Sequence, residues 1–152
     1  MNTLELKIPP VVVVAMTGGL MWGVSQLLPN LEVLAEYQWM ARPFWIAAVI
    51  VMVGGILQFA VKRTTVDPHR VGRATSLVTG GLYRLTRNPM YLGMFLGLAG
   101  LVFYLANLAA IVGLPAFIAY MDRFQIEPEE RKLTELFGDE YTAYLARTRR
   151  WL

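Results

Sequence analysis

Apolar residues are gathered in long runs along this chain, separated by polar stretches. Three runs contain no charged residue: 11–28, 44–61 and 90–121. A helix needs about 20 apolar residues to cross the hydrocarbon core of a bilayer, so each of the first two runs predicts one span. The third run is too long for one span, and we divide it near Asn107 into spans at 90–105 and 108–124. The pattern predicts an all-α integral membrane protein with four transmembrane helices, the last two forming a helical hairpin.

The polar segments predict how these spans are oriented. The loop at 62–89 carries six Lys and Arg residues against one Asp, an excess that favours the cytoplasmic side. The tail at 125–152 is amphipathic and is predicted to form cytoplasmic helices, with Pro128 in the first turn of one and Gly138 ending it. Four spans then place both termini in the cytoplasm. We expect a single membrane domain over 1–152, in the cytoplasmic or inner membrane if the protein is bacterial.

The amino-acid composition excludes several kinds of catalytic and metal site. The chain is 56% hydrophobic and contains no cysteine and one histidine, His69. Cysteine nucleophiles, Cys-ligated metals and multi-His metal sites are therefore excluded, and we predict no metal site. The net charge of +3 comes from basic residues that flank the apolar runs, so it gives no case for nucleic-acid binding.

A first cluster of candidate functional residues surrounds the start of the third apolar run. Asn88 before Pro89 is typical of a helix N-cap followed by the first helical residue. A helix N-terminus beside Arg84 and Arg87 also offers donors and positive potential to an anion. Glycines follow at helical spacing, and they indicate either close helix packing or room for a flat ligand: Gly93, Gly97 and Gly100.

A second cluster is the acidic pair Glu129–Glu130 at the start of a tail helix. Such a pair complements the helix dipole, and it could instead bind ribose hydroxyls or an ammonium group. Together the two clusters would form a clamp with one positive and one negative side, ringed by aromatic residues such as Tyr83 and Tyr91. This clamp suits a zwitterionic ligand that carries a fixed positive charge.

The same residues carry a family resemblance. The series Leu82-Tyr83-Arg84-x-x-Arg87-Asn88-Pro89-Met90-Tyr91-Leu92-Gly93, followed by Glu129-Glu130-x-x-Leu133-x-x-x-Phe137-Gly138-x-x-Tyr141-x-x-Tyr144, resembles the isoprenylcysteine carboxyl methyltransferase family, which is related to the membrane phospholipid methyltransferases. The match runs from about Thr64 to Leu152. It implies an S-adenosylmethionine-dependent methyltransferase whose cofactor binds at the cytoplasmic face and whose lipid or prenylated substrate enters from the bilayer.

The resemblance also implies which residues bind the cofactor. The candidates lie in both clusters: Tyr83, Arg87, Asn88, Pro89, Tyr91, Leu92, Gly93, Glu129, Glu130 and Leu133. The family usually has histidine where this chain has Asn88, and asparagine keeps a hydrogen-bonding side chain but cannot titrate.

Methyl transfer is an in-line displacement that mainly requires alignment of the reactants and exclusion of water. A carboxylate or thiolate acceptor needs only an orienting cation, for which the candidate catalytic residues are Arg84, Arg87 and Arg131. An amine acceptor would need a proton acceptor, and the candidates are Glu129, Glu130 and Tyr83. Prenylated peptides, phospholipid amines, isoprenoid acids and small thiols all remain open as acceptors.

Two other functions are compatible with the sequence. Some sterol reductases resemble this C-terminal half, but they bind NADPH and have many more spans. A non-catalytic membrane protein, such as a transporter subunit, would be favoured by an intramembrane charge, and spans one to three contain none. The oligomeric state is left open, because glycine faces pack within one chain or between two.

Overall fold

The computed structural model describes residues 5–27, 35–62 and 76–152, and within these ranges it contains helices and no strand. In chain order the elements are α1 (Pro10–Leu27), η1 (Gln38–Met40), α3 (Ala41–Lys62), η3 (Gly81–Arg84), α4 (Pro89–Leu105), η4 (Leu108–Val112), α5 (Gly113–Met121), η5 (Asp122–Ile126), α6 (Glu127–Phe137) and α7 (Asp139–Arg147). The η elements are short 3₁₀ helices, except η5, which is a π-helical turn. The predicted all-α class is confirmed. Residues 63–75 of the predicted cytoplasmic loop lie outside the described ranges.

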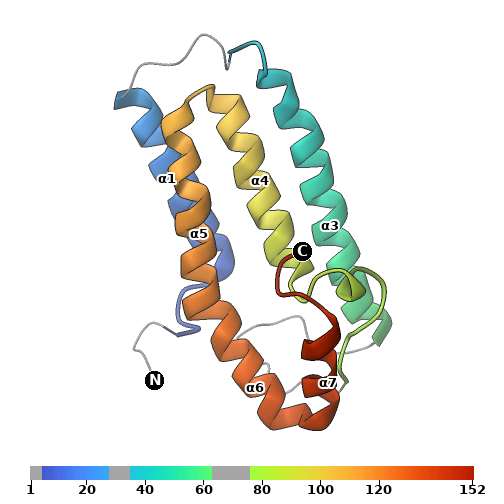
Figure 1. Ribbon diagram of the computed structural model, residues 1–152. Helices are drawn as coiled ribbons and strands as arrows, with labels where there is room; N and C mark the ends of the chain where they lie inside the picture. The colour runs from blue at the N-terminus through green and yellow to red at the C-terminus, as the bar shows by residue number, and fades with distance from the viewer. Residues whose placement is uncertain (1–4, 28–34, 63–75) are drawn as a thin grey trace.

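Four helices, α1, α3, α4 and α5, run side by side along the long axis of the molecule (Figure 1). The helix α4 packs mainly against α3 and also contacts α1 and α5. Glycines make the α3–α4 contact close: a Cβ on Gly93 would lie 2.9 Å from the carbonyl oxygen of Ala48, and one on Gly100 would lie 2.6 Å from Trp45. Of the two interpretations of this glycine face, helix packing therefore accounts for Gly93 and Gly100.

Two helical stretches are long and apolar enough to cross a membrane, Pro10–Leu27 and Gln38–Val61. Their outward faces carry exposed apolar side chains, including Leu20, Ile50 and Val61, which suits contact with lipid. The apolar helix α4 is shorter, at 17 residues. The four-span topology and the cytoplasmic position of both termini stay predictions.

The helical hairpin turns where the sequence indicates. After α4, Ala106 adopts a left-handed conformation with φ 49°. The side chain of Asn107 then accepts a hydrogen bond from the backbone N–H of Ala109 at 3.0 Å and donates to the carbonyl of Ser25 at 3.4 Å. Asn107 therefore caps η4 and also ties the hairpin to the end of α1.

The tail helix α6 begins at Glu127 and has Pro128 in its first turn, as predicted. The chain does not break before it near residue 124, but continues as one helical path from α5 through η5 into α6 (Figure 1). Pro128 lacks an N–H to bond the carbonyl of Phe124, four residues earlier, and the N–H of Leu6 donates to that carbonyl instead, at 3.0 Å. The end of α6 is as predicted, since Gly138 with φ 51° terminates it and α7 begins at Asp139.

Candidate functional site

The first predicted cluster lies at the start of α4, against the segment that follows α7. We call Thr148–Trp151 the docked segment. The backbone N–H of Arg87 donates to the carbonyl of Arg149 at 2.9 Å. The Thr86 hydroxyl and the Asn88 side-chain amide both donate to the carbonyl of Arg150, each at 3.1 Å. Residues 86–88 are therefore bound along the backbone of the docked segment.

Asn88 occupies the N-cap position of α4 and Pro89 follows as predicted, but the expected side-chain cap is absent. The amide of Asn88 bonds the docked segment instead of an N–H of α4, and its own backbone N–H donates to Thr86 Oγ1 at 3.1 Å. Asn88 is the N-cap residue as predicted, but its side-chain oxygen accepts no hydrogen bond from an N–H of α4, and the side chain instead donates through Nδ2 to the docked segment.

The positive and negative sides of the predicted clamp meet directly. Arg87 donates to the carbonyls of Leu145 and Thr148 at 3.2 and 2.8 Å, and to Glu130 Oε1 at 2.9 Å. The Arg87 and Glu130 side chains are only 13% and 16% exposed. Arg150 adds a second cation to Glu130, with Nε 3.3 Å from Oε1 and NH2 2.7 Å from Oε2. Two guanidinium groups therefore satisfy the Glu130 carboxylate.

Glu129, the other member of the acidic pair, has a different environment. Its Oε1 accepts a hydrogen bond of 2.5 Å from the Tyr91 hydroxyl, and among the described residues it takes part in no ion pair. Burial raises the pKa of Glu129 to about 8, against the lowering effects of the Tyr91 hydrogen bond and the Lys132 charge, and the Glu130 charge adds to the rise. A further cation placed beside this carboxyl would favour its ionised form at neutral pH.

Tyr83 and Leu133 belong to an apolar cluster next to the polar residues. Tyr83 is buried with Val78, Tyr141 and Tyr144, and Leu133 packs against the same group. The hydroxyl of Tyr144 donates to the Tyr83 carbonyl at 2.6 Å. Burial raises the pKa of the Tyr83 phenol well above its usual value, so this side chain stays protonated. Pro89 and Leu92 are buried on α4.

The structure separates the other two candidate arginines from this cluster. Arg84 is exposed at the end of η3, and Arg131 pairs with Glu5 at 2.6 Å. No described contact joins either one to the Arg87–Glu130 pair.

The docked segment makes a contribution to this cluster that no sequence motif indicates. Besides bonding Glu130, Arg150 lies 3.6 Å from Asp122, whose Oδ1 also accepts a hydrogen bond from Trp151 Nε1 at 3.0 Å. Trp151 in turn packs near Phe95 of α4, with ring centroids 6.3 Å apart. From the sequence, the arginines of the tail indicated only the membrane topology. No helical spacing relates the docked segment to residues 86–88 or to Glu130.

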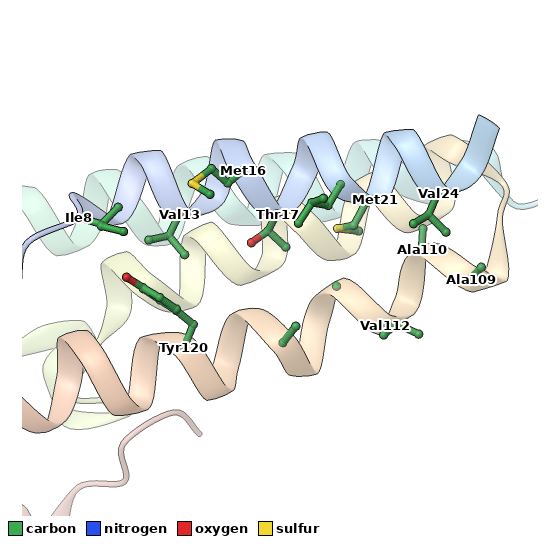
Figure 2. A pocket seen from close by; sticks show the side chains of 13 residues that line it. Ile8, Val13, Met16, Thr17, Met21, Val24, Ala109, Ala110, Val112 and Tyr120 are labelled. Atoms are coloured by element: carbon green, nitrogen blue, oxygen red, sulfur yellow. The ribbon is translucent and has the colours of Figure 1, made fainter. Parts of the chain in front are cut away.

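An apolar groove lies between α1 and the η4–α5 stretch, with a cavity volume of about 440 Å³. Its lining is almost wholly apolar, and Figure 2 shows Tyr120 pointing into it from α5 near Ile8 and Val13. Within the described structure the Tyr120 hydroxyl has no hydrogen-bond partner. Tyr120 lies at the end of the groove nearer to the Glu129–Glu130 pair, because the helical path continues from Tyr120 through η5 to Glu129.

Comparisons with known proteins match a family model to most of this chain. Residues 43–140 match the family model described as phospholipid methyltransferase, a range that includes the start of α4 and the Glu129–Glu130 pair. An uncharacterized protein of Haemophilus influenzae is 43% identical over 63 residues, which cover 41% of this chain and all of that protein. No solved structure matches the chain.

Proposed function

This chain belongs to the phospholipid methyltransferase family, and from that membership we propose that it transfers a methyl group from S-adenosylmethionine to a lipid-like acceptor held in the membrane. The observation that carries the proposal is Glu129, a half-buried carboxyl that accepts a hydrogen bond from the Tyr91 hydroxyl, feels the nearby Lys132 charge and forms no ion pair among the described residues. The family match does not favour the NADPH-dependent reductase. The narrower resemblance to isoprenylcysteine carboxyl methyltransferases stays a prediction, and so does a phospholipid amine or small thiol as acceptor.

The charges of the site fit a positively charged cofactor. Glu130 forms ion pairs with Arg87 and Arg150, whereas Glu129, when it ionises, has only the more distant Lys132 charge to offset its own. A sulfonium or ammonium group beside Glu129 would supply a directly paired cation, next to the Tyr91 ring whose hydroxyl bonds the same carboxyl. S-adenosylmethionine would supply the methyl group. The remaining candidate cofactor residues would form the frame around this contact.

Proton handling depends on the acceptor. For an amine, Glu129 is the best-suited proton acceptor, because its pKa of about 8 lies near neutral pH. Tyr83 retains its own proton, and Glu130 is engaged by two guanidinium groups. For a carboxylate or thiolate no proton moves, and an orienting cation suffices. Exposed Arg84 then remains the candidate with the greatest freedom, since Arg87 is held by two carbonyls and Glu130 and Arg131 is paired with Glu5.

The groove between α1 and α5 gives this acceptor a place. Its volume falls within the range of about 300–1,000 Å³ typical of ligand sites, and its apolar lining suits a hydrocarbon chain. The Tyr120 hydroxyl could donate to an ester or amide oxygen of the head group. We propose that the acceptor lies with its chain along the groove and its polar end toward Glu129.

Cofactor binding tests the function most directly. Titration of the purified, detergent-solubilised protein with S-adenosylmethionine should give saturable heat, and titration with NADPH should give none. Heat with NADPH alone would favour the reductase, and no heat with either ligand on a folded protein would contradict the proposal. Incubating membranes with methyl-labelled cofactor and identifying the labelled product would then distinguish carboxyl, amine and thiol acceptors.

The groove yields a separate prediction. Ala116→Trp places an indole in the groove, and we expect methylation of a long-chain acceptor to fall about tenfold, the scale on which apolar pockets discriminate. Binding of S-adenosylmethionine should be unchanged. Ala119→Trp is the matched control, because Ala119 is exposed on the same helix and does not line the groove. Equal rates for the two variants would exclude the groove as the acceptor site.

A further inference from the structure

The docked segment contacts residues on both sides of the candidate site. The carbonyls of Thr148, Arg149 and Arg150 accept hydrogen bonds from residues 86–88. On its other side, the Arg150 guanidinium binds the Glu130 carboxylate and lies 3.6 Å from Asp122. The segment therefore joins the loop before α4 to the η5–α6 stretch, and Arg150 takes part in both halves of that connection.

Arg150 also determines how charge is distributed over the acidic pair. Its NH2 group is the donor to Glu130 Oε2, while Arg87 and the Nε of Arg150 both donate to Oε1. If Arg150 is removed, Glu130 keeps one cation and one oxygen loses its donor. Glu130 would then be held by Arg87 alone, and its position relative to Glu129 would be less fixed.

We infer that Arg150 is a positioning residue of the cofactor site, which holds Glu130 and residues 86–88 in place so that Glu129 alone receives the positive charge of the ligand. The inference rests on the proposed function, because it takes S-adenosylmethionine as that ligand. Arg150 itself binds protein groups on both sides, so its action on the ligand is indirect. Its loss should therefore weaken cofactor binding more than it slows the chemical step.

Three variants test this role. Arg150→Gln should raise the Kd and KM for S-adenosylmethionine about tenfold, as expected when a charge-assisted hydrogen bond is lost, and should leave kcat at saturating cofactor within about twofold. Arg150→Lys keeps the charge but cannot bond both carboxylate oxygens in a fork, so it should restore binding in part. Arg149→Gln is the matched control, because the Arg149 side chain is exposed and only its backbone carbonyl is used.

The outcomes separate the inference from the function. If wild-type protein binds S-adenosylmethionine and Arg150→Gln binds it as tightly as Arg149→Gln does, the positioning role is wrong. A lower melting temperature with unchanged Kd would also overturn it, since that result describes a purely structural ion pair. Should Arg150→Gln fail to fold, Arg150→Lys must show the rise in Kd. Absence of cofactor binding by wild-type protein would instead refute the proposed function.

Discussion

Replacing Arg87 with alanine should destabilise the protein by about 3–5 kcal/mol, the cost of removing one partner from a buried ion pair. Glu130 would lose one of its two cations, and the carbonyls of Leu145 and Thr148 would lose a shared donor. Arg87→Lys should lie between wild type and Arg87→Ala, since an ammonium group cannot reach all three acceptors in the geometry of a guanidinium. Thermal unfolding in detergent, followed by circular dichroism, measures the effect.

Arg84→Ala is the control for this experiment. Arg84 lies three residues earlier and is exposed, so we expect a change within about 0.5 kcal/mol. Similar losses in Arg84→Ala and Arg87→Ala would mean that the loss of positive charge, and not the buried network, accounts for the effect. Retention of full stability in Arg87→Ala would contradict the central place given to the Arg87–Glu130 pair.

Glu129→Gln should weaken S-adenosylmethionine binding by about 10- to 100-fold, because a hydrogen bond or contact involving a charged group contributes about 1.5–3 kcal/mol. The substitution keeps an acceptor for the Tyr91 hydroxyl but removes the negative charge. Stability should not fall, since the neutral amide avoids the desolvation cost that raises the pKa of Glu129. Calorimetric titration and thermal unfolding of the same preparation measure both quantities.

The pH dependence gives a second readout of Glu129. Because its pKa is raised from 4.5 to about 8, the folded protein without ligand holds this proton more tightly than the unfolded chain, and stability falls as pH rises between these values. Cation binding needs the ionised form, so affinity should rise by up to about tenfold per pH unit below 8. Tyr91, Lys132 and Glu130 are the groups whose charges or hydrogen bonds act on this carboxyl.

Measurements between about pH 6 and 7.5 avoid the titration of the α-amino group of the cofactor, which has a pKa of about 8. Glu129→Gln should remove the pH dependence in that window. Glu127→Gln is the matched control, since Glu127 is on the same helix and forms an exposed i,i+4 pair with Arg123. An unchanged pH profile in Glu129→Gln would assign the titration to another group.

Local sequence patterns predicted the parts of the fold that depend on neighbouring residues. The apolar runs gave the helices, Asn107 marked the hairpin, and Gly138 marked the end of α6. Pro128 lies in the first turn of α6 as predicted, but the continuous helical path through η5 that leads into it was not predicted. Here the carbonyl that Pro128 leaves unpaired receives its donor from Leu6, which no local pattern could reveal.

The candidate site was predicted in part for a similar reason. Motif spacing brought Arg87 and Glu130 into one hypothesis, and the structure joins them by an ion pair of 2.9 Å. It could not show that Glu130 is neutralised while Glu129 is not, since that difference depends on Arg150 from an irregular segment. The assignments of Gly93 and Leu133 to the cofactor stay predictions, and the packing of each against its neighbours explains them without a ligand.

Two hydrogen bonds join residues 6 and 8 to η5, the turn that leads into the helix bearing Glu129, and they have a consequence for engineering this protein. Leu6 donates to Phe124, and Gln125 donates to the carbonyl of Ile8 at 2.6 Å. The region matched by the family begins at residue 43, so α1 and its lead lie outside it. The lead to α1 nevertheless forms hydrogen bonds to η5. Exchanging α1 and its lead for an unrelated membrane anchor would remove these two constraints on the path of η5 and α6. The first helix is thus no interchangeable module.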